Sequence, residues 1–313
     1  MAIKRIQNRV AESRYTLPAS IMTAFVIWYL AGLTAVPLYL SFAATLLTTY
    51  TLVEINNGNS LLRIYSRTVS SSFILLLSGA TFLLPNLTAM AVTLCYTLFC
   101  LYLFRVYQEK EAPGGVFHAF LFLGIASIFF IQIAFLVPFL WILMTFNLMA
   151  MSHRNFWASV LGLITPYWFA IPFWLYKKDI ESVVNHFVQI ADFQELFQYE
   201  QIPLTYLLTF AFIVMIALFG IIHFLRKSFM DKIRTRMLYT FFIVMTILLV
   251  VFIVLQPQHD EILLPLLIVH VSPLFAHYLS LTNTRLTNIT FFLLIILWVA
   301  LTVYNLWNFS PIF

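Results

Sequence analysis

Three ionisable side chains stand next to one another just before a long apolar stretch, at His259, Asp260 and Glu261. A carboxylate beside an imidazole can act as a general base toward a hydroxyl group, and the same set can bind a cation. Acidic residues at the start of a helix also stabilise that helix without any further role. The sequence therefore predicts a candidate catalytic corner here, with the purely structural role as the alternative.

Two histidines follow within the same apolar stretch, His270 and His277, with Pro273 between them. Their separation of seven residues places both on one face of a helix. Ionisable residues inside a membrane segment are costly and indicate function by default. A neutral histidine can also hydrogen-bond a neighbouring helix, and a proline frees a backbone carbonyl that can accept such a bond. We predict an intramembrane polar face, with helix-to-helix bonding as the alternative.

The third candidate site is basic. Arg63 and Arg67 are four residues apart, which would place them on one helical face, and Arg105 and Arg154 stand at the ends of neighbouring apolar stretches. Guanidinium groups bind phosphate through paired hydrogen bonds. We predict that these arginines contact the phosphate of a lipid headgroup or of a phosphorylated substrate. The alternative is that they only orient the chain in a membrane.

Other kinds of chemistry have no pattern in this sequence. It contains no phosphate-binding loop, no dinucleotide-binding glycine motif, no serine nucleophile elbow and no histidine–cysteine set with metal-ligand spacing. We therefore expect no cofactor and no metal. No Asp or Glu lies deep inside a predicted membrane span, which weighs against an ion-coupled transporter.

The composition places all of these residues in a membrane protein. Hydrophobic residues make up 62% of the 313 residues and charged residues only 9%, with a mean hydropathy of +0.95. A soluble domain carries roughly 25% charged residues. This composition excludes a soluble fold, a disordered chain, a coiled coil and a nucleic-acid partner. The apolar runs do not alternate with polar residues, so a transmembrane β-barrel is excluded as well.

A membrane-spanning helix needs about 20 mainly apolar residues, and eleven stretches approach that length. We expect an all-α, polytopic bundle of about eleven spans that forms a single membrane domain over residues 1–313. The first and second spans, and the fifth and sixth, would form tight hairpins or contain a re-entrant end. The expected spans are 17–33, 35–53, 68–84, 88–106, 116–132, 134–151, 156–176, 203–225, 237–256, 262–281 and 287–307.

The basic residues predict an orientation. With the N-terminus in the cytoplasm, 15 of the 17 Lys and Arg residues fall in cytoplasmic segments, and only Lys177 and Lys178 fall outside. This distribution follows the positive-inside rule and predicts an external C-terminus. The net charge of +5 is then a consequence of membrane topology rather than of an anionic ligand.

The longest external segment, 177–201, is expected to contain an amphipathic helix. Apolar residues recur there at helical spacing, from Ile180 to Ala191, opposite polar residues such as Glu181 and Asn185. Such a helix lies flat on a membrane surface or covers a cavity between spans. A structural cover and a substrate-facing lid are both consistent with the pattern.

Several short blocks of the chain resemble a family of uncharacterised inner-membrane proteins of the Bacteroidota. The resemblance lies in Asn56–Asn57 with Arg67–Ser70, Leu98–Arg105, Phe117–Ser127, His153–Trp157, His259–Leu264, Pro273 and Ala276–Tyr278. The blocks are spread over most of the chain. The resemblance implies a polytopic fold in the bacterial inner (cytoplasmic) membrane, and it implies no activity, because the family is a domain of unknown function.

Three functions remain open from the sequence, and whether the protein is an enzyme is undecided. The first is the handling of polyprenyl-phosphate-linked glycan or lipid substrates at the outer leaflet of the cell envelope. Transferases of that kind usually keep a carboxylate in the first external loop, whereas residues 31–37 contain none. The second is a transporter or flippase with a histidine-lined path. The third is a non-catalytic subunit or assembly factor. Membrane lipids, a lipid-linked substrate and other membrane proteins are the expected partners.

Overall fold

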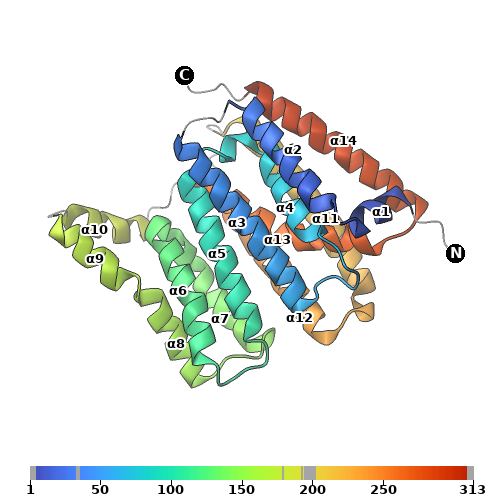
Figure 1. The fold of residues 1–313 in the computed structure, drawn as a ribbon. Helices are drawn as coiled ribbons and strands as arrows, with labels where there is room; N and C mark the ends of the chain where they lie inside the picture. Colours follow the sequence, from blue (N-terminus) through green and yellow to red (C-terminus); the bar gives the residue numbers. More distant parts are fainter. Residues whose placement is uncertain (1–4, 33–35, 178–179, 192, 194–201, 309–313) are drawn as a thin grey trace. The chain divides into compact units, whose positions relative to one another are not determined.

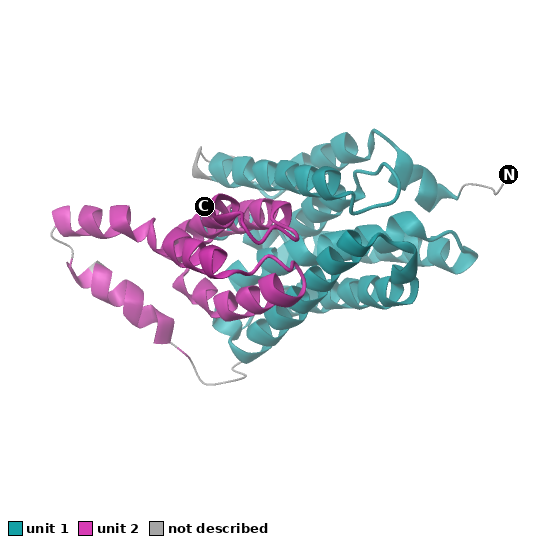
Figure 2. Cartoon of the chain, turned by 90° about the horizontal axis from the view of Figure 1, so that it is seen from below, with its two compact units in different colours: residues 1–90, 197–313 teal, residues 91–196 magenta. Residues whose placement is uncertain are grey.

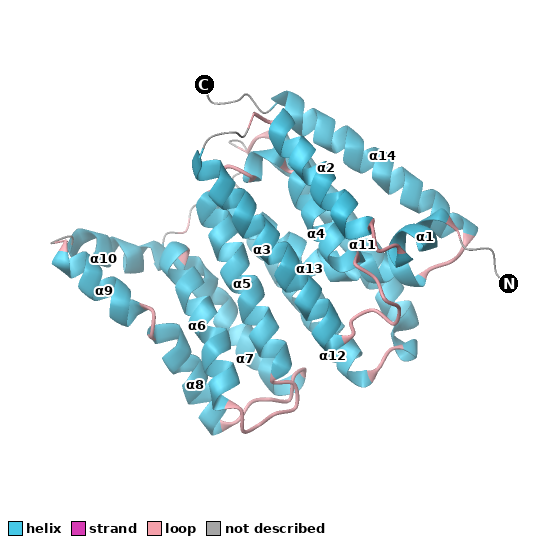
Figure 3. Cartoon of the chain, in the orientation of Figure 1, coloured by secondary structure: helices cyan, strands magenta, loops and turns pink. Residues whose placement is uncertain are grey.

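The computed structural model describes residues 5–32, 36–177, 180–191, 193 and 202–308. Among these residues every regular element is a helix (Figures 1 and 3). The chain divides into two compact units, residues 1–90 with 197–313 and residues 91–196, coloured teal and magenta in Figure 2. The helical class is as expected. That residues 1–313 act as one membrane domain stays a prediction.

The first unit is built from both ends of the chain. Its α-helices are α1 (Ile6–Glu12), α2 (Thr16–Leu30), α3 (Val36–Asn59), α4 (Thr68–Gly79), α11 (Leu204–Lys227), α12 (Ile233–Leu255), α13 (Asp260–Leu281) and α14 (Arg285–Asn308). Short 3-10 turns, η1 (Thr81–Leu83), η4 (Ser228–Met230) and η5 (Pro257–His259), join some of them. Helix α5 (Leu87–Arg105) begins in this unit and continues into the second.

The second unit contains the middle of the chain. Its helices are α6 (Pro113–Phe129), η2 (Ile131–Leu136), α7 (Val137–Phe146), α8 (His153–Ile164), α9 (Tyr167–Tyr176), α10 (Ile180–Val188) and η3 (Gln189–Ala191). Helices α6 and α8 pack closely against each other. Both carry a glycine where they touch: a Cβ on Gly162 would lie 2.6 Å from the carbonyl oxygen of Phe117, and one on Gly124 would lie 2.6 Å from that of Leu163. Small residues let helix backbones approach this closely in membranes.

Seven helical segments of the described chain are long and apolar enough to cross a membrane. They are Leu38–Asn59, Leu87–Arg105, His153–Tyr176, Leu204–Met230, Ile233–Leu255, Pro257–Leu281 and Arg285–Asn308. The other four expected spans coincide with shorter apolar helices, Thr16–Leu30, Thr68–Gly79, Pro113–Phe129 and Ile131–Phe146. The protein is thus a multi-pass membrane protein by helix length and composition. The count of eleven spans, the cytoplasmic N-terminus and the external C-terminus stay predictions.

Three expected spans differ from the structure in their continuity. The span expected at 134–151 begins as the 3-10 turn η2 and continues as a helix of ten residues that ends at Phe146. The span expected at 156–176 is divided into α8 and α9 just before Pro166, which cannot donate a backbone hydrogen bond. The span expected at 68–84 ends as an α-helix at Gly79.

Helix α4 can end inside apolar surroundings because α14 supplies hydrogen-bond donors to it. Trp298 Nε1 donates to the carbonyl of Leu75 at 2.9 Å, and Asn305 Nδ2 donates to the carbonyl of Gly79 at 2.8 Å. The last carbonyl groups of a helix have no partner within it, and in a bilayer no water replaces that partner. The Gly79 carbonyl is one of these end groups and Asn305 supplies its partner, while Trp298 adds a hydrogen bond to the preceding turn.

Helix α13 forms the centre of the first unit. Every side chain from Leu263 to Ser280 except Phe275 is buried, and the helix packs against α1, α4, α11 and α12. A helix that is apolar on all sides belongs in the interior of a bundle. Asp260 and Glu261 lie at its start, His270 in its middle and His277 near its end. Asp260 and His277 are about 26 Å apart along the axis at 1.5 Å per residue.

Candidate functional site

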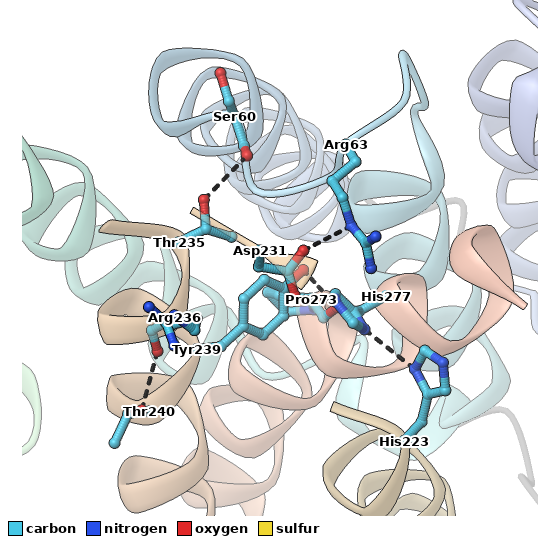
Figure 4. A network of polar contacts seen from close by, with 10 residues as sticks. All are labelled: Ser60, Arg63, His223, Asp231, Thr235, Arg236, Tyr239, Thr240, Pro273 and His277. Carbon is cyan, nitrogen blue, oxygen red and sulfur yellow. Dashed lines mark hydrogen bonds and ion pairs between the residues drawn. The ribbon is translucent and has the colours of Figure 1, made fainter. Parts of the chain in front are cut away.

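The site centres on Asp231, a carboxylate in the connection between η4 and α12. Its side chain is completely shielded from solvent. One carboxylate oxygen, Oδ1, forms an ion pair with Nε of Arg63 at 2.7 Å, and the other, Oδ2, lies 3.1 Å from Nε2 of His277 (Figure 4). A buried carboxylate is stable only when its charge is compensated by partners of this kind.

The end of α3 brings Arg63 to Asp231. Helix α3 stops at Asn59, and Ser60 adopts the left-handed conformation with φ of 49°. The Leu61 N–H donates to the carbonyl of Asn56 at 3.2 Å, which is the closing bond of a Schellman motif. The chain therefore turns sharply after α3, and Arg63 follows in an irregular segment rather than on a helix.

The close packing of α11 on α13 brings two histidines together. A Cβ on Gly220 would lie 2.8 Å from the backbone of Leu274, so only a glycine allows this approach. His223 and His277 each stand three residues further along these two helices, and their Nδ1 atoms are 3.1 Å apart. Because Asp231 accepts from Nε2 of a neutral His277, Nδ1 of that ring is left to accept from His223.

These contacts make one continuous chain of ionisable groups, Arg63–Asp231–His277–His223, which we call the Asp231 network (Figure 4). Its first and last members are partly exposed and its two central members are fully buried. Each ring nitrogen of His277 has a polar partner, so this histidine can gain or lose a proton without losing its contacts. Such chains are typical of proton relays in membrane proteins.

Aromatic side chains surround His277 and separate it from water. The Tyr239 ring centroid lies 4.9 Å from that of His277, and the Phe224 centroid lies 5.4 Å from it. The Tyr239 hydroxyl donates to the carbonyl of Pro273 at 3.3 Å. An apolar wall of this kind strengthens electrostatic interactions inside it, because little water screens them.

His270 has different surroundings, although it is equally buried. Its ring contacts Phe241 and Phe242, with centroid separations of 6.0 and 5.7 Å. It lies about 10 Å from His277 along α13. Both histidines face α12, as a spacing of seven predicts, but only His277 belongs to the Asp231 network.

The three residues of the predicted catalytic corner, at the other end of α13, have separate surroundings. Glu261 accepts hydrogen bonds from Asn86 Nδ2 at 2.8 Å and from the Tyr206 hydroxyl at 3.1 Å, so it ties the start of α13 to α11 and to the chain before α5. Asp260 lines a cavity of about 290 Å³ whose other lining residues are mostly apolar. Glu261 does not line that cavity.

His259 has a third set of neighbours. Its Nε2 lies 3.2 Å from the Gln258 amide, and its ring packs on Phe252. The three residues thus point to three different environments. They begin a helix as predicted, with η5 leading directly into α13, and a joint catalytic role stays a prediction.

Of the four arginines, Arg63 and Arg67 lie in the first unit and Arg105 and Arg154 lie in the second. Arg63 and Arg67 do not share a helical face as expected, because both lie in the segment between α3 and α4 and Arg67 precedes the first residue of α4. Arg67 contacts Asn57 at 3.4 Å and lies over the ring of Tyr65. Arg105 ends α5, and Arg154 is the second residue of α8; both are exposed. That they bind phosphate stays a prediction.

A polar cavity of about 400 Å³ lies beside the Asp231 network. Arg63 contributes to both, since it lines the cavity and pairs with Asp231. Its other lining residues are Asn56, Asn57, Ser60, Leu62, Ile64, Tyr65, Ser66, Lys232 and Thr235. Another cavity of the first unit, about 330 Å³ in volume, is lined by residues of α1, α2, α4, α11, α13 and α14 and by no member of the network.

In the second unit, α10 and η3 are the described helical part of the amphipathic segment expected at 177–201. Residues 178–179, 192 and 194–201 of that segment lie outside the described residues. Phe187 of α10 lines a cavity of about 550 Å³ together with Tyr167 and Ser127. The Tyr167 hydroxyl bonds Nε2 of His186 at 3.2 Å and the Ser127 hydroxyl at 2.9 Å. Helix α10 is therefore anchored to this unit through His186.

Acidification is expected to loosen α10. Burial lowers the pKa of His186 below its ordinary value of 6.5, so the docked helix binds a proton less well than a released one. Docking is then strongest above that ordinary value and weakens as the pH falls below it. A spin label at Val184→Cys should gain mobility between pH 7 and 5, and the same label with His186→Gln should respond far less. Equal responses would show that another group controls this helix.

Two members of the network were not identified from the sequence. Asp231 was overlooked because it lies between two spans rather than within one, and His223 because it stands alone in α11. One signal was present: Asp231 is the single acidic residue in the basic run from Arg226 to Arg236. A lone carboxylate among cations is a candidate ion-pair partner.

Among the described residues, no group of three or more His, Cys, Asp or Glu side chains is arranged to hold a metal ion. Comparison with known proteins adds no relative: no family model, no curated protein and no solved structure matches this chain.

Proposed function

We propose that this protein is a membrane transporter of the flippase type, which moves an anionic, phosphate-bearing lipid and couples that movement to protonation of the Asp231 network. The observation that carries the proposal is the fully buried Asp231 carboxylate, which is shared between the permanent cation Arg63 and the titratable imidazole of His277. A buried ionisable cluster is expensive in an apolar bundle and is expected where function requires it.

Arg63 and His277 share the Asp231 carboxylate, so protonation of His277 can change how strongly Asp231 holds Arg63. When His277 is neutral, Asp231 is compensated chiefly by Arg63. When His277 gains a proton, it becomes a second cation beside Asp231, and Arg63 is freer to bind an anion. Proton binding and anion binding then favour each other, and thermodynamic linkage makes the effect mutual.

Few charged or titratable residues lie near His277. Asp231 and Arg63 come from the connections before α12 and α4, His223 from α11 and Tyr239 from α12. Lys227 acts electrostatically on His223. Helix α4 has no titratable residue, while α1 carries Arg9 and Glu12 and α14 begins at Arg285. Within this set His277 and His223 are the residues whose ordinary pKa lies near neutral pH.

The first alternative, handling of polyprenyl-phosphate-linked substrates by an external catalytic corner, has weaker support. His259, Asp260 and Glu261 have separate hydrogen-bond partners, and the cavity beside Asp260 has no second Asp, Glu, His, Lys or Arg in its lining. A passive subunit has no evident use for a buried ionisable chain. The transporter alternative is the one that gives the Asp231 network a role.

We further propose the bacterial inner membrane as the location and membrane lipids as the main partners. The resemblance to inner-membrane proteins of the Bacteroidota supports this, as does the distribution of basic residues. Many large apolar side chains on α2, α9, α11 and α14 are exposed, which fits helices that face lipid or other membrane proteins.

The proposal is tested by lipid translocation in vesicles. The purified protein is reconstituted into liposomes that contain a trace of fluorescent phosphatidylglycerol, and dithionite bleaching reports how much label reaches the outer leaflet. We expect faster bleaching than in protein-free liposomes and a rate that changes with an imposed pH gradient. Fluorescent phosphatidylcholine serves as the control lipid. A rate equal to that of protein-free liposomes, with and without the gradient, would contradict the proposal.

A further inference from the structure

The polar cavity beside the network lies at the N-terminus of α12. Lys232 precedes the first residue of this 23-residue helix, Thr235 is its third residue, and both line the cavity. The first N–H groups of a helix have no partner within it, and the helix dipole adds partial positive charge at this end. A helix N-terminus of this kind attracts anions.

Two cationic side chains line the same cavity. Lys232 is exposed, while 31% of the Arg63 side chain is exposed. Arg63 uses Nε for Asp231, and among the described residues no acceptor occupies its two Nη groups. A guanidinium with free Nη groups beside an ammonium group is suited to bind the oxygens of a phosphate.

Asn56 supplies an independent observation. It is 7% exposed, lines the cavity and donates from Nδ2 to the carbonyl of Ser66 at 3.0 Å, but its Oδ1 has no hydrogen-bond partner among the described residues. A buried acceptor without a donor is costly. A ligand with a hydroxyl or amine next to its phosphate would satisfy it.

We infer that this cavity binds a phosphate group whose own headgroup carries a hydrogen-bond donor, with Arg63, Lys232 and the first turn of α12 on the phosphate and Asn56 Oδ1 on the donor. The inference deepens the proposed transport function and rests on it for its biological use. The negative charge of Asp231 repels an anion, so the phosphate binds by competing with the Asp231 carboxylate for Arg63. The second basic residue of this cavity is Lys232 and not Arg67, which was expected from the sequence.

The positive-inside rule explains basic residues without any ligand, so the test needs a basic residue of the same region as its control. Arg67 is that residue, because it lies four residues from Arg63 and does not line the cavity. Binding of inorganic phosphate and of dihexanoyl-phosphatidylglycerol to the full-length protein in detergent is measured by calorimetry. Dihexanoyl-phosphatidylcholine, which has no hydroxyl or amine donor in its headgroup, is the control ligand.

We expect Lys232→Gln and Arg63→Gln to weaken binding about tenfold and Arg67→Gln to leave it unchanged. Asn56→Asp, which keeps an acceptor at Oδ1 and adds a negative charge, should also weaken it. Binding of the lipid alone would identify a headgroup as the source, and binding of inorganic phosphate alone would identify a soluble ligand. Equal losses in Lys232→Gln and Arg67→Gln, or binding of neither ligand, would overturn the inference.

The two proposals can fail separately. Binding that depends on Lys232, without any lipid translocation in liposomes, would retain the phosphate site and refute the transport function. Translocation that persists in Lys232→Gln, with no phosphate binding in any variant, would retain transport and refute the site.

Discussion

Gly162→Ala is expected to cause a large loss of stability, because the new methyl group would lie 2.6 Å from the carbonyl oxygen of Phe117 and 3.0 Å from the backbone of Leu121. Backbone atoms cannot move aside as a flexible side chain can, so α6 and α8 must separate. Overpacking of this kind costs about 1–3 kcal/mol. The melting midpoint in detergent, followed by tryptophan fluorescence, should fall clearly below that of the wild-type protein.

Gly58→Ala is the matched control. Gly58 also lies in a helix, α3, but nothing lies within 4 Å of a Cβ built there. Alanine stabilises an exposed helix by about 0.5–1 kcal/mol relative to glycine, so this variant should melt at the wild-type temperature or above it. Similar midpoints for Gly58→Ala and Gly162→Ala would mean that α6 and α8 are not packed as described.

Asp231→Asn is expected to have the largest effect on activity. The substitution keeps the shape of the side chain but removes the charge that Arg63 and His277 share. Lipid translocation should fall about tenfold or more, because proton binding and anion binding are no longer coupled. Stability should change little, since Arg63 is partly exposed and can turn toward water. Both quantities are measured on the same preparation.

Glu261→Gln is the control for this prediction. It removes a carboxylate from the opposite end of the same helix, where the glutamine carbonyl can still accept from Asn86 and the glutamine amide can donate to the Tyr206 hydroxyl oxygen. We expect near-normal translocation. The reverse pattern, with activity lost in Glu261→Gln and kept in Asp231→Asn, would place the working site at the start of α13.

The helical class was predictable from the sequence, because the length of each apolar stretch was sufficient to indicate a helix. Continuity within the spans was less predictable. Helix α4 can end at Gly79 because Trp298 and Asn305, which lie more than 200 residues later in the sequence, donate hydrogen bonds to its carbonyl groups. No local pattern near residue 79 contains that information.

The site was predictable only in part. His277 and Arg63 were candidates because intramembrane histidines and paired arginines are conspicuous in a sequence. Their partner Asp231 was not identified, since only the turn at Ser60 and the end of α11 bring it between them. His223 was missed for the same reason, because its contact depends on the close approach of two helices at Gly220.

The most direct test of the central claim is to count protons during ligand binding. Dihexanoyl-phosphatidylglycerol is added to the protein in weakly buffered detergent solution near pH 7, and a pH-sensitive dye reports the change. Its phosphodiester does not titrate in this range, so any change comes from the protein. We predict proton uptake by the wild-type protein and almost none by Asp231→Asn or His277→Gln. Equal proton uptake in all three, or binding by the wild-type protein without uptake, would contradict a coupling through the Asp231 network.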